Sequence, residues 1–145
     1  MNNQINLGNC VLAIQSVIQE IKIISLDKVL LIYPIVYQKS LLNIISRKSN
    51  TPKSFEQLII NHPDLFSDFD NIYYSNLSLS INSIQYLHEM EYINLNEGVI
   101  TVNKEIEFNK KMGPVVEKYY NSASCIAKIL SMPSEYLYLN LRINL

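Results

Sequence analysis

A change from helical to extended periodicity between residues 77 and 102 is the feature that most restricts how this chain can fold. β-Branched and aliphatic residues flank a short loop at 96–98, whose Gly98 tolerates a positive φ. Before this loop, apolar residues at steps of three or four predict one buried face of a helix over 78–92: Leu77, Ile81, Ile84, Leu87 and Met90. The pattern predicts a helix, capped by Ser78 or Ser80, that leads directly into a β-hairpin.

Two shorter helical segments precede that helix. They cover residues 54–60 and 64–74 and are separated by His62 and Pro63, because the residue before a proline is disfavoured in the α region. Helices packed under a hairpin make the outline of a winged helix-turn-helix. The sequence therefore predicts a core of this kind over residues 53–104.

Helices are also predicted on the N-terminal side of this core. A stripe of aliphatic residues predicts a helix over 10–24 that starts at Gly8 or Asn9. The next element runs to about residue 46 and is apolar on most sides, so it is expected to be buried. Pro34 lies within it and predicts a bent helix, because proline removes a backbone donor.

On the C-terminal side, residues 104–111 are predicted to be helical at least in part, and 115–130 form a helix with Pro114 in its first turn. The apolar tail from Ser134 is costly to leave in water, so it is expected to dock on its own core or on another chain. The predicted fold class is mainly α with one β-hairpin. The chain is interpreted as a single domain over 1–145 with three parts: N-terminal helices at 1–48, the winged-helix-like core at 53–104 and C-terminal helices at 105–145.

The distribution of charge argues against direct reading of DNA by the predicted core. No Lys or Arg occurs between Lys53 and Lys104, and this interval holds seven acidic residues, whereas the net charge of the whole chain is only −1. A helix in the major groove reads bases with Arg, Lys, Asn or Gln. The helix before the hairpin offers Asn82 and Gln85 beside Glu89 but no cation. Possible contacts to a DNA backbone are predicted elsewhere: Arg47, Lys48, Lys110 and Lys111.

No pattern in the sequence predicts catalysis, a metal site or a cofactor. The glycines stand alone and make no phosphate-binding loop. His62 and His88 are isolated from each other and from Cys10 and Cys125, which lie in apolar helical contexts typical of buried free thiols. Lys22 is the first basic residue, and polar side chains interrupt the N-terminal apolar stretch, so neither a signal peptide nor a membrane span is predicted. The expected location is the cytoplasm.

Contact with other proteins is the function that the composition favours. Charged residues make up 17% of the chain and hydrophobic residues 48%, so some apolar surface is expected to be covered by a partner. The candidate partner-interface residues lie on the helix before the hairpin and in the tail: Gln85, Glu89, Tyr136, Tyr138 and Leu141.

The segment 26–40, LDKVLLIYPIVYQKS, resembles the middle component of three-component ABC systems, in which an apolar helical run meets a proline, two aliphatic residues and a polar pair. Other segments follow in the expected order: Asn2 and Asn3 before an apolar helix, SINSIQYLHEMEYI at 80–93 before a hairpin, and a closing helix from Val115 with Pro133 after it. The resemblance covers nearly the whole length and consists of hydrophobic patterning, so it transfers no functional residue.

The resemblance implies a non-catalytic subunit, similar to the accessory subunit of Lamassu-type antiphage systems. Such a subunit bridges an SMC-like or Rad50-like ATPase and an effector, often a nuclease, and it meets DNA through the complex. A second hypothesis from the residues remains open, namely a winged-helix transcriptional regulator that reads DNA through Asn82 or Gln85. The two hypotheses differ in the effect that salt should have. The affinity of a specific operator complex should fall steeply as the salt concentration rises.

Overall fold

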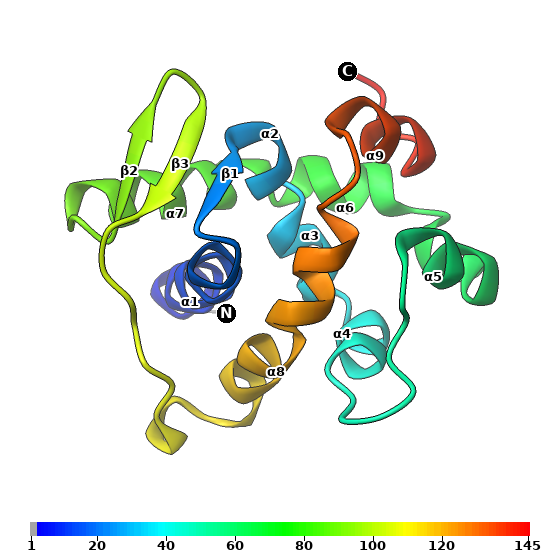
Figure 1. Ribbon diagram of the computed structural model, residues 1–145, viewed down its shortest axis with the longest axis horizontal. Coiled ribbons are helices and arrows are strands. Elements are labelled where there is room, and N and C mark those ends of the chain that lie inside the picture. The colour runs from blue at the N-terminus through cyan, green and yellow to red at the C-terminus, as the bar shows by residue number, and fades with distance from the viewer. Residues whose placement is uncertain (1–2) are drawn as a thin grey trace.

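The computed structural model describes residues 3–145, and side-chain surroundings from residue 6 onward (Figure 1). The predicted mainly α class with one β-hairpin is confirmed. Its elements follow in this order: α1 (Asn3–Ile21), β1 (Ile23–Ser25), α2 (Leu26–Val29), α3 (Ile32–Tyr37), α4 (Lys39–Ile45), α5 (Phe55–Asn61), the 3₁₀ helix η1 (Pro63–Phe66), α6 (Phe69–Ser75), α7 (Leu77–Glu89), β2 (Ile93–Asn96), β3 (Val99–Val102), the 3₁₀ helix η2 (Lys110–Met112), α8 (Pro114–Ile129) and α9 (Ser134–Asn140).

Helix α1 lies at the centre of the core. It packs against α7 on one side and against α8 on the other, and the hairpin stands beside its C-terminal end (Figure 1). The helix begins at Asn3 and runs through Gly8 and Asn9, so the predicted start at either residue is wrong. Buried side chains come from all three predicted parts of the chain and form one contiguous cluster.

The hairpin is confirmed, and a third strand completes its sheet. Strand order is β1-β3-β2, with both pairings antiparallel. Glu97 and Gly98 have φ of 52° and 77°, as the tight two-residue turn of a hairpin requires. The sequence placed residues 23 and 24 in the first helix, which is wrong. That helix ends at Ile21, and Lys22 takes a left-handed φ of 80°, which turns the chain into β1.

Helix α7 was predicted, but its buried face differs from the predicted one. Its N-cap is Asn76, and neither Ser78 nor Ser80 caps it. Small residues at Ser80 and Ser83 are fully buried in place of larger ones, and the Ser83 hydroxyl is satisfied within the helix by the carbonyl of Leu79 at 2.8 Å. Ile81 and Met90, predicted to be buried, are each 49% exposed.

The apolar segment after β1 is broken, as Pro34 predicted, although the sharp bend lies elsewhere. Pro34 occupies the first turn of α3, where a missing backbone donor is tolerated. The chain turns at Gln38, where Leu26–Tyr37 and Lys39–Ile45 meet at 104°. Within residues 3–145, no single helix is long and apolar enough to cross a membrane, and only this bent pair passes on combined length and composition.

The remaining helices agree with the sequence to within a few residues. Ser54 caps α5 by accepting a hydrogen bond from the backbone N–H of Gln57. The predicted segment 64–74 is divided into η1 and α6. Pro114 occupies the first position of α8, as expected.

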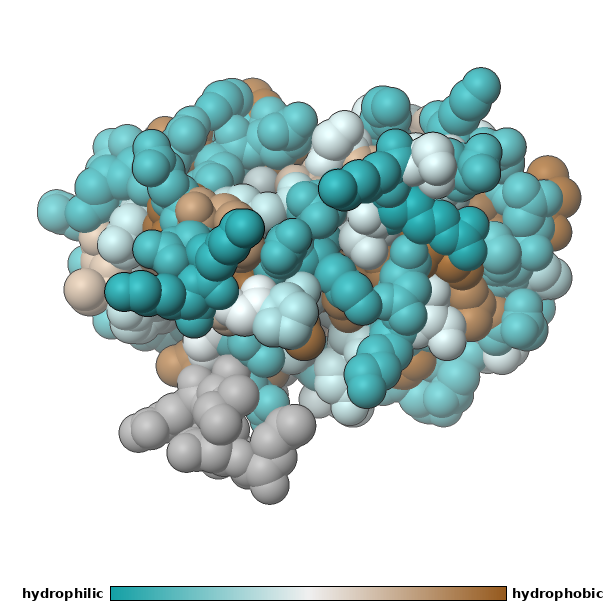
Figure 2. Space-filling model, turned by 90° about the horizontal axis from the view of Figure 1, so that it is seen from below, coloured by the Kyte–Doolittle hydropathy of each residue, from teal (hydrophilic) through white to brown (hydrophobic). Residues whose placement is uncertain are grey.

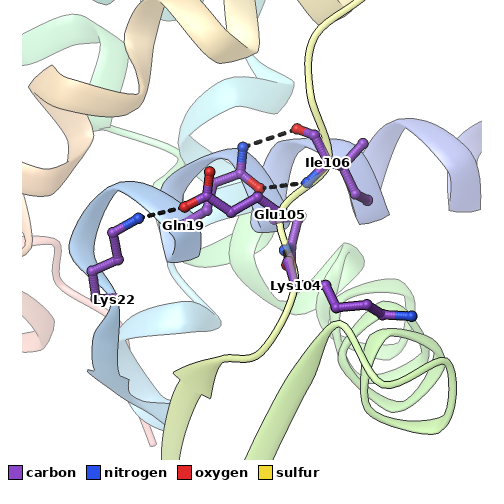
Figure 3. A network of polar contacts seen from close by, with 6 residues as sticks. Gln19, Lys22, Lys104, Glu105 and Ile106 are labelled. Carbon is purple, nitrogen blue, oxygen red and sulfur yellow. Dashed lines mark hydrogen bonds and ion pairs between the residues drawn. The ribbon is translucent and has the colours of Figure 1, made fainter.

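Over 104–111, which was predicted to be helical at least in part, only the last residues are helical, and residues 104–109 run as an extended chain (Figure 3). Several of their backbone groups bind two glutamine side chains of α1, and the carbonyl of Ile106 also accepts from the hydroxyl of Tyr120 at 2.7 Å. The Gln19 amide accepts from the N–H of Ile106 and donates to its carbonyl, both at 3.0 Å, and Gln15 donates to the carbonyl of Lys104 at 2.8 Å. Lys22 and Glu105 add an exposed ion pair at 2.6 Å. Only η2, at the end of the segment, is helical.

Replacing Gln19 with methionine should lower the free energy of unfolding by about 1–3 kcal/mol, because the N–H of Ile106 loses its acceptor and the carbonyl of Ile106 keeps only the Tyr120 hydroxyl as donor. Urea denaturation followed by circular dichroism measures this difference. Lys22→Met is the matched control: it removes an ion pair whose two side chains are more than half exposed, which contributes only about 0–1 kcal/mol. Equal losses in both variants would contradict a special role for Gln19.

Candidate partner interface

Two of the predicted interface residues lie together on the outer surface of α7. Gln85 and Glu89 are both exposed, and the Gln85 amide donates a hydrogen bond to the Glu89 carboxylate at 3.3 Å. Large apolar side chains share this surface, namely Ile81, Tyr86 and Met90. Because large hydrophobic residues in water are costly when they cluster, this surface is the strongest candidate for a partner contact.

An apolar groove runs along one side of this surface. We call it the α7 groove; its volume is 320 Å³, and it is lined by residues of α2, α7 and β2: Leu26, Leu30, Ile81, Ile84, Gln85, His88 and Leu95. Leu95 pairs with Ile100 of β3, which in turn pairs with Ile24 of β1, so the three lie on one face of the sheet, and Ile100 and Ile24 are buried. The groove is therefore the open end of the hydrophobic core.

The sequence singled out Gln85 but missed that the groove exists. Leu26 and Leu30 lie more than 50 residues before Ile81 and Leu95 in the chain, so no periodicity joins the two sides of the groove. The sequence of α7 contains one sign of an exposed apolar surface. Ser80 and Ser83 occupy part of the buried face, so the large apolar residues of this helix cannot all be buried.

Acidic residues lie near the α7 groove, and one of them, Glu89, is hydrogen-bonded to the lining residue Gln85. Glu89 and Glu91 lie at the C-terminal end of α7, and Glu97 lies at the tip of the hairpin. Leu30 also lines a neighbouring hollow that contains Asp27 and Glu135. No Lys or Arg is among the lining residues of the groove.

Asp27 remains charged near this surface. Partial burial raises its pKa, but hydrogen bonds from Ser25, Ser134 and the backbone N–H of Lys28 outweigh that effect and lower the pKa below its ordinary value. The carboxylate therefore contributes negative charge at neutral pH.

The other three predicted interface residues belong to α9 and are used largely within the chain. Tyr138 is 9% exposed; its hydroxyl donates to the carbonyl of Asp27 at 2.6 Å and lies 3.1 Å from the hydroxyl of Tyr73. Leu141 is buried. Tyr136 is half-buried and donates to the carboxylate of Glu56 at 3.0 Å. The tail thus docks on its own core, which argues against direct partner contacts by Tyr138 and Leu141.

The basic residues predicted to meet DNA lie away from α7. Arg47 and Lys48 are exposed in the turn after α4, and Lys110 and Lys111 are exposed in η2. Figure 1 places η2 and the chain after α4 at the lower edge, opposite the hairpin. The face seen from below in Figure 2 is mostly hydrophilic, with apolar residues scattered over it. These basic residues therefore lie at a different part of the molecule from the apolar α7 groove and its neighbour Glu89.

Metal binding and nucleophilic catalysis make specific demands on the titratable side chains of the described residues. Among residues 3–145, no group of three or more His, Cys, Asp or Glu is placed to hold a metal ion. Both cysteines are free and buried. Burial raises the pKa of the Cys10 thiol to about 12, despite opposing hydrogen bonds with Ser83 and Ser80, and burial also raises the pKa of Cys125. Thiols of this kind are poor nucleophiles at neutral pH.

A comparison with known protein families assigns the chain. Residues 4–145 match the family described as ABC-three component (ABC-3C) system Middle Component 3. The chain belongs to this family. No curated protein and no solved structure matches it.

Membership of the Middle Component 3 family confirms the resemblance to a middle component of three-component ABC systems. The segments that carried the resemblance form structural elements of this family member. Residues 26–40 form α2, α3 and the start of α4, which are largely buried, and residues 80–93 form most of α7 and the start of β2. The Asn2 part of the pattern lies outside the described residues. The resemblance therefore reports on the fold, whereas the candidate interface comes from the geometry of α7.

Proposed function

We propose that this Middle Component 3 chain is a non-catalytic adaptor that bridges an SMC-like or Rad50-like ATPase and an effector nuclease in a prokaryotic defence complex of the Lamassu type. The observation that carries this proposal is the match to a middle component over residues 4–145. A middle component of a multi-component system has partner subunits, and the α7 groove offers a surface on which one of them can bind. In this proposal the complex works in the cytoplasm against viral or plasmid DNA.

The distribution of charge supports an adaptor over a DNA reader. The order of α7, β2 and β3, with β1 as the third strand, supports a winged-helix interpretation, in which α7 would be the helix that enters the major groove. Its outer surface offers Gln85 bonded to Glu89, exposed apolar side chains and no Lys or Arg. Such a surface repels phosphates and lacks the cations that hold a protein on DNA.

The alternative, a winged-helix transcriptional regulator, has one observation in its favour. Asn82 and Gln85 are both exposed on α7, and amide side chains of this kind read adenine in the major groove. In the adaptor proposal, DNA is reached through the complex, with Arg47, Lys48, Lys110 and Lys111 as its possible backbone contacts.

Co-expression of the chain with the ATPase and the effector encoded beside it tests the adaptor. A single assembly should elute from size-exclusion chromatography, and ATPase and effector should separate when the chain is omitted. Elution of the chain apart from both would contradict the proposal.

The isolated chain should bind duplex DNA only non-specifically, with a Kd of about 10⁻⁴ to 10⁻⁶ M at physiological salt. Fluorescence anisotropy measures this affinity. Tight, sequence-selective binding that Asn82→Ala or Gln85→Ala abolishes would favour the regulator instead.

A further inference from the structure

The α7 groove is shaped to receive side chains that enter from outside. Ile84, which is 4% exposed, lies deepest, whereas Ile81 and Leu95 are 49% and 36% exposed and stand at the sides. These three residues belong to a helix and a sheet, so the groove is held by regular elements and not by loops. A rigid apolar hollow of this kind is the usual receptor for an anchoring side chain.

The surroundings of the groove select the charge of the occupant. Glu89 is hydrogen-bonded to the lining residue Gln85, Glu97 lies two residues after the lining residue Leu95, and the neighbouring hollow adds Asp27 and Glu135. Lys104 follows the hairpin, and its Nζ lies 4.7 Å from the centroid of the Tyr92 ring. A segment with Lys or Arg beside its apolar residues complements this surface, since opposite potentials across an interface favour the correct partner.

A second copy of the chain does not fit this requirement when the two copies meet face to face. An isologous dimer would bring the same acidic surface of each copy together. Like charges placed opposite one another oppose such a contact. The charge therefore argues against a self-complementary dimer through this groove and favours a partner that carries its own basic residues.

The lining also selects the conformation of the occupant. Ile81, Gln85 and His88 follow one another at steps of four and three along α7, so that side of the groove repeats once per helical turn. An amphipathic helix presents its apolar side chains with the same repeat. An extended peptide would instead pair with β2, which is an edge strand of only four residues.

We propose that the α7 groove binds a basic amphipathic helix of a partner subunit, with aliphatic side chains between Leu95 and Ile81 and Lys or Arg side chains facing Glu89 and Glu97. This inference rests on the proposed function, because the partner is one of the two components that the adaptor bridges. It adds the site, the conformation of the bound segment and the sign of its charge.

Substitution at the groove in the co-expressed complex tests the site. Ile81→Arg and Leu95→Arg each place a cation in the groove, close to the Lys or Arg side chains of the bound helix. Each should raise the Kd of the assembly by about 10-fold or more. Ile60→Arg is the matched control, because Ile60 is a 75% exposed isoleucine on α5, at the end of the molecule away from the hairpin (Figure 1), and it should leave Kd unchanged. Biolayer interferometry measures Kd, and circular dichroism of the isolated variants verifies their fold.

A photo-crosslinking amino acid at Gln85 in the otherwise native complex identifies the occupant without relying on a destabilising change. Mass spectrometry should find a partner segment with apolar residues at helical spacing and several Lys or Arg. A crosslink to a second copy, to an acidic segment or to DNA would overturn the inference.

The two proposals fail in different ways. If the wild-type complex forms and both groove variants keep its Kd, the groove inference is overturned while the adaptor function stands. If the wild-type chain assembles with neither component, the adaptor function fails, and the inference about its partner helix fails with it.

Discussion

Replacing Tyr138 with alanine should lower the free energy of unfolding by about 3–5 kcal/mol, the range for loss of a buried aromatic side chain. The ring packs edge-on against Tyr73, with centroids 5.7 Å apart, and the hydroxyl joins α9 to the carbonyl of Asp27 in α2. The alanine variant both leaves a cavity and loses the hydrogen bond from the Tyr138 hydroxyl to the carbonyl of Asp27. Urea denaturation followed by circular dichroism gives the free energy of each variant.

Two controls separate the packing of Tyr138 from its hydrogen bonds. Tyr138→Phe keeps the ring and loses the donor to Asp27, so it should cost about 1–3 kcal/mol. Leu139→Ala changes an exposed neighbour on the same helix and should stay within about 0.5 kcal/mol. A Tyr138→Ala variant as stable as Leu139→Ala would show that α9 is not docked as described.

Replacing Ile100 with alanine should cost about 2–5 kcal/mol, since the side chain is fully buried. Ile100 lies in the central strand β3, opposite Ile24 of β1 and Leu95 of β2. The loss of this one side chain therefore weakens contacts with both neighbouring strands. Thermal unfolding and urea denaturation should both register the change.

Val99→Ala is the matched control for Ile100, because adjacent residues of a strand point to opposite faces of the sheet. Val99 is on the same strand and is exposed, so its truncation should have a small effect. A larger loss at position 99 than at position 100 would mean that the sheet packs on the core through its other face.

Elements whose signals are local were predictable from the sequence. The hairpin follows from β-branched residues around Gly98, and α8 follows from Pro114 and the helical spacing after it. Strand β1 was missed because it has three residues and exists through its partner β3, far along the chain. The extended segment at 104–109 was missed for a similar reason, since its backbone partners are the side chains of Gln15 and Gln19.

The candidate interface was predictable only in part. The exposure of Gln85 and Glu89 follows from their polarity and from the helical repeat of α7. The burial of Tyr138 does not follow, because an apolar tail can cover its own core or another chain equally well. The groove needed the structure, since Leu26 and Leu95 meet only when β1 and α2 are placed beside the hairpin.

The pairing of β1 with β3 also constrains when the chain can fold during synthesis. The 73 residues between these strands, 26–98, take about 4–15 seconds to synthesise at typical ribosomal rates. Until β3 has been synthesised, β1 lacks its partner strand and the apolar residues of α1 and β1 stay exposed to solvent. The α7 groove is also incomplete at this stage. A partner that recognises the finished groove would therefore join only after the ribosome has passed residue 102.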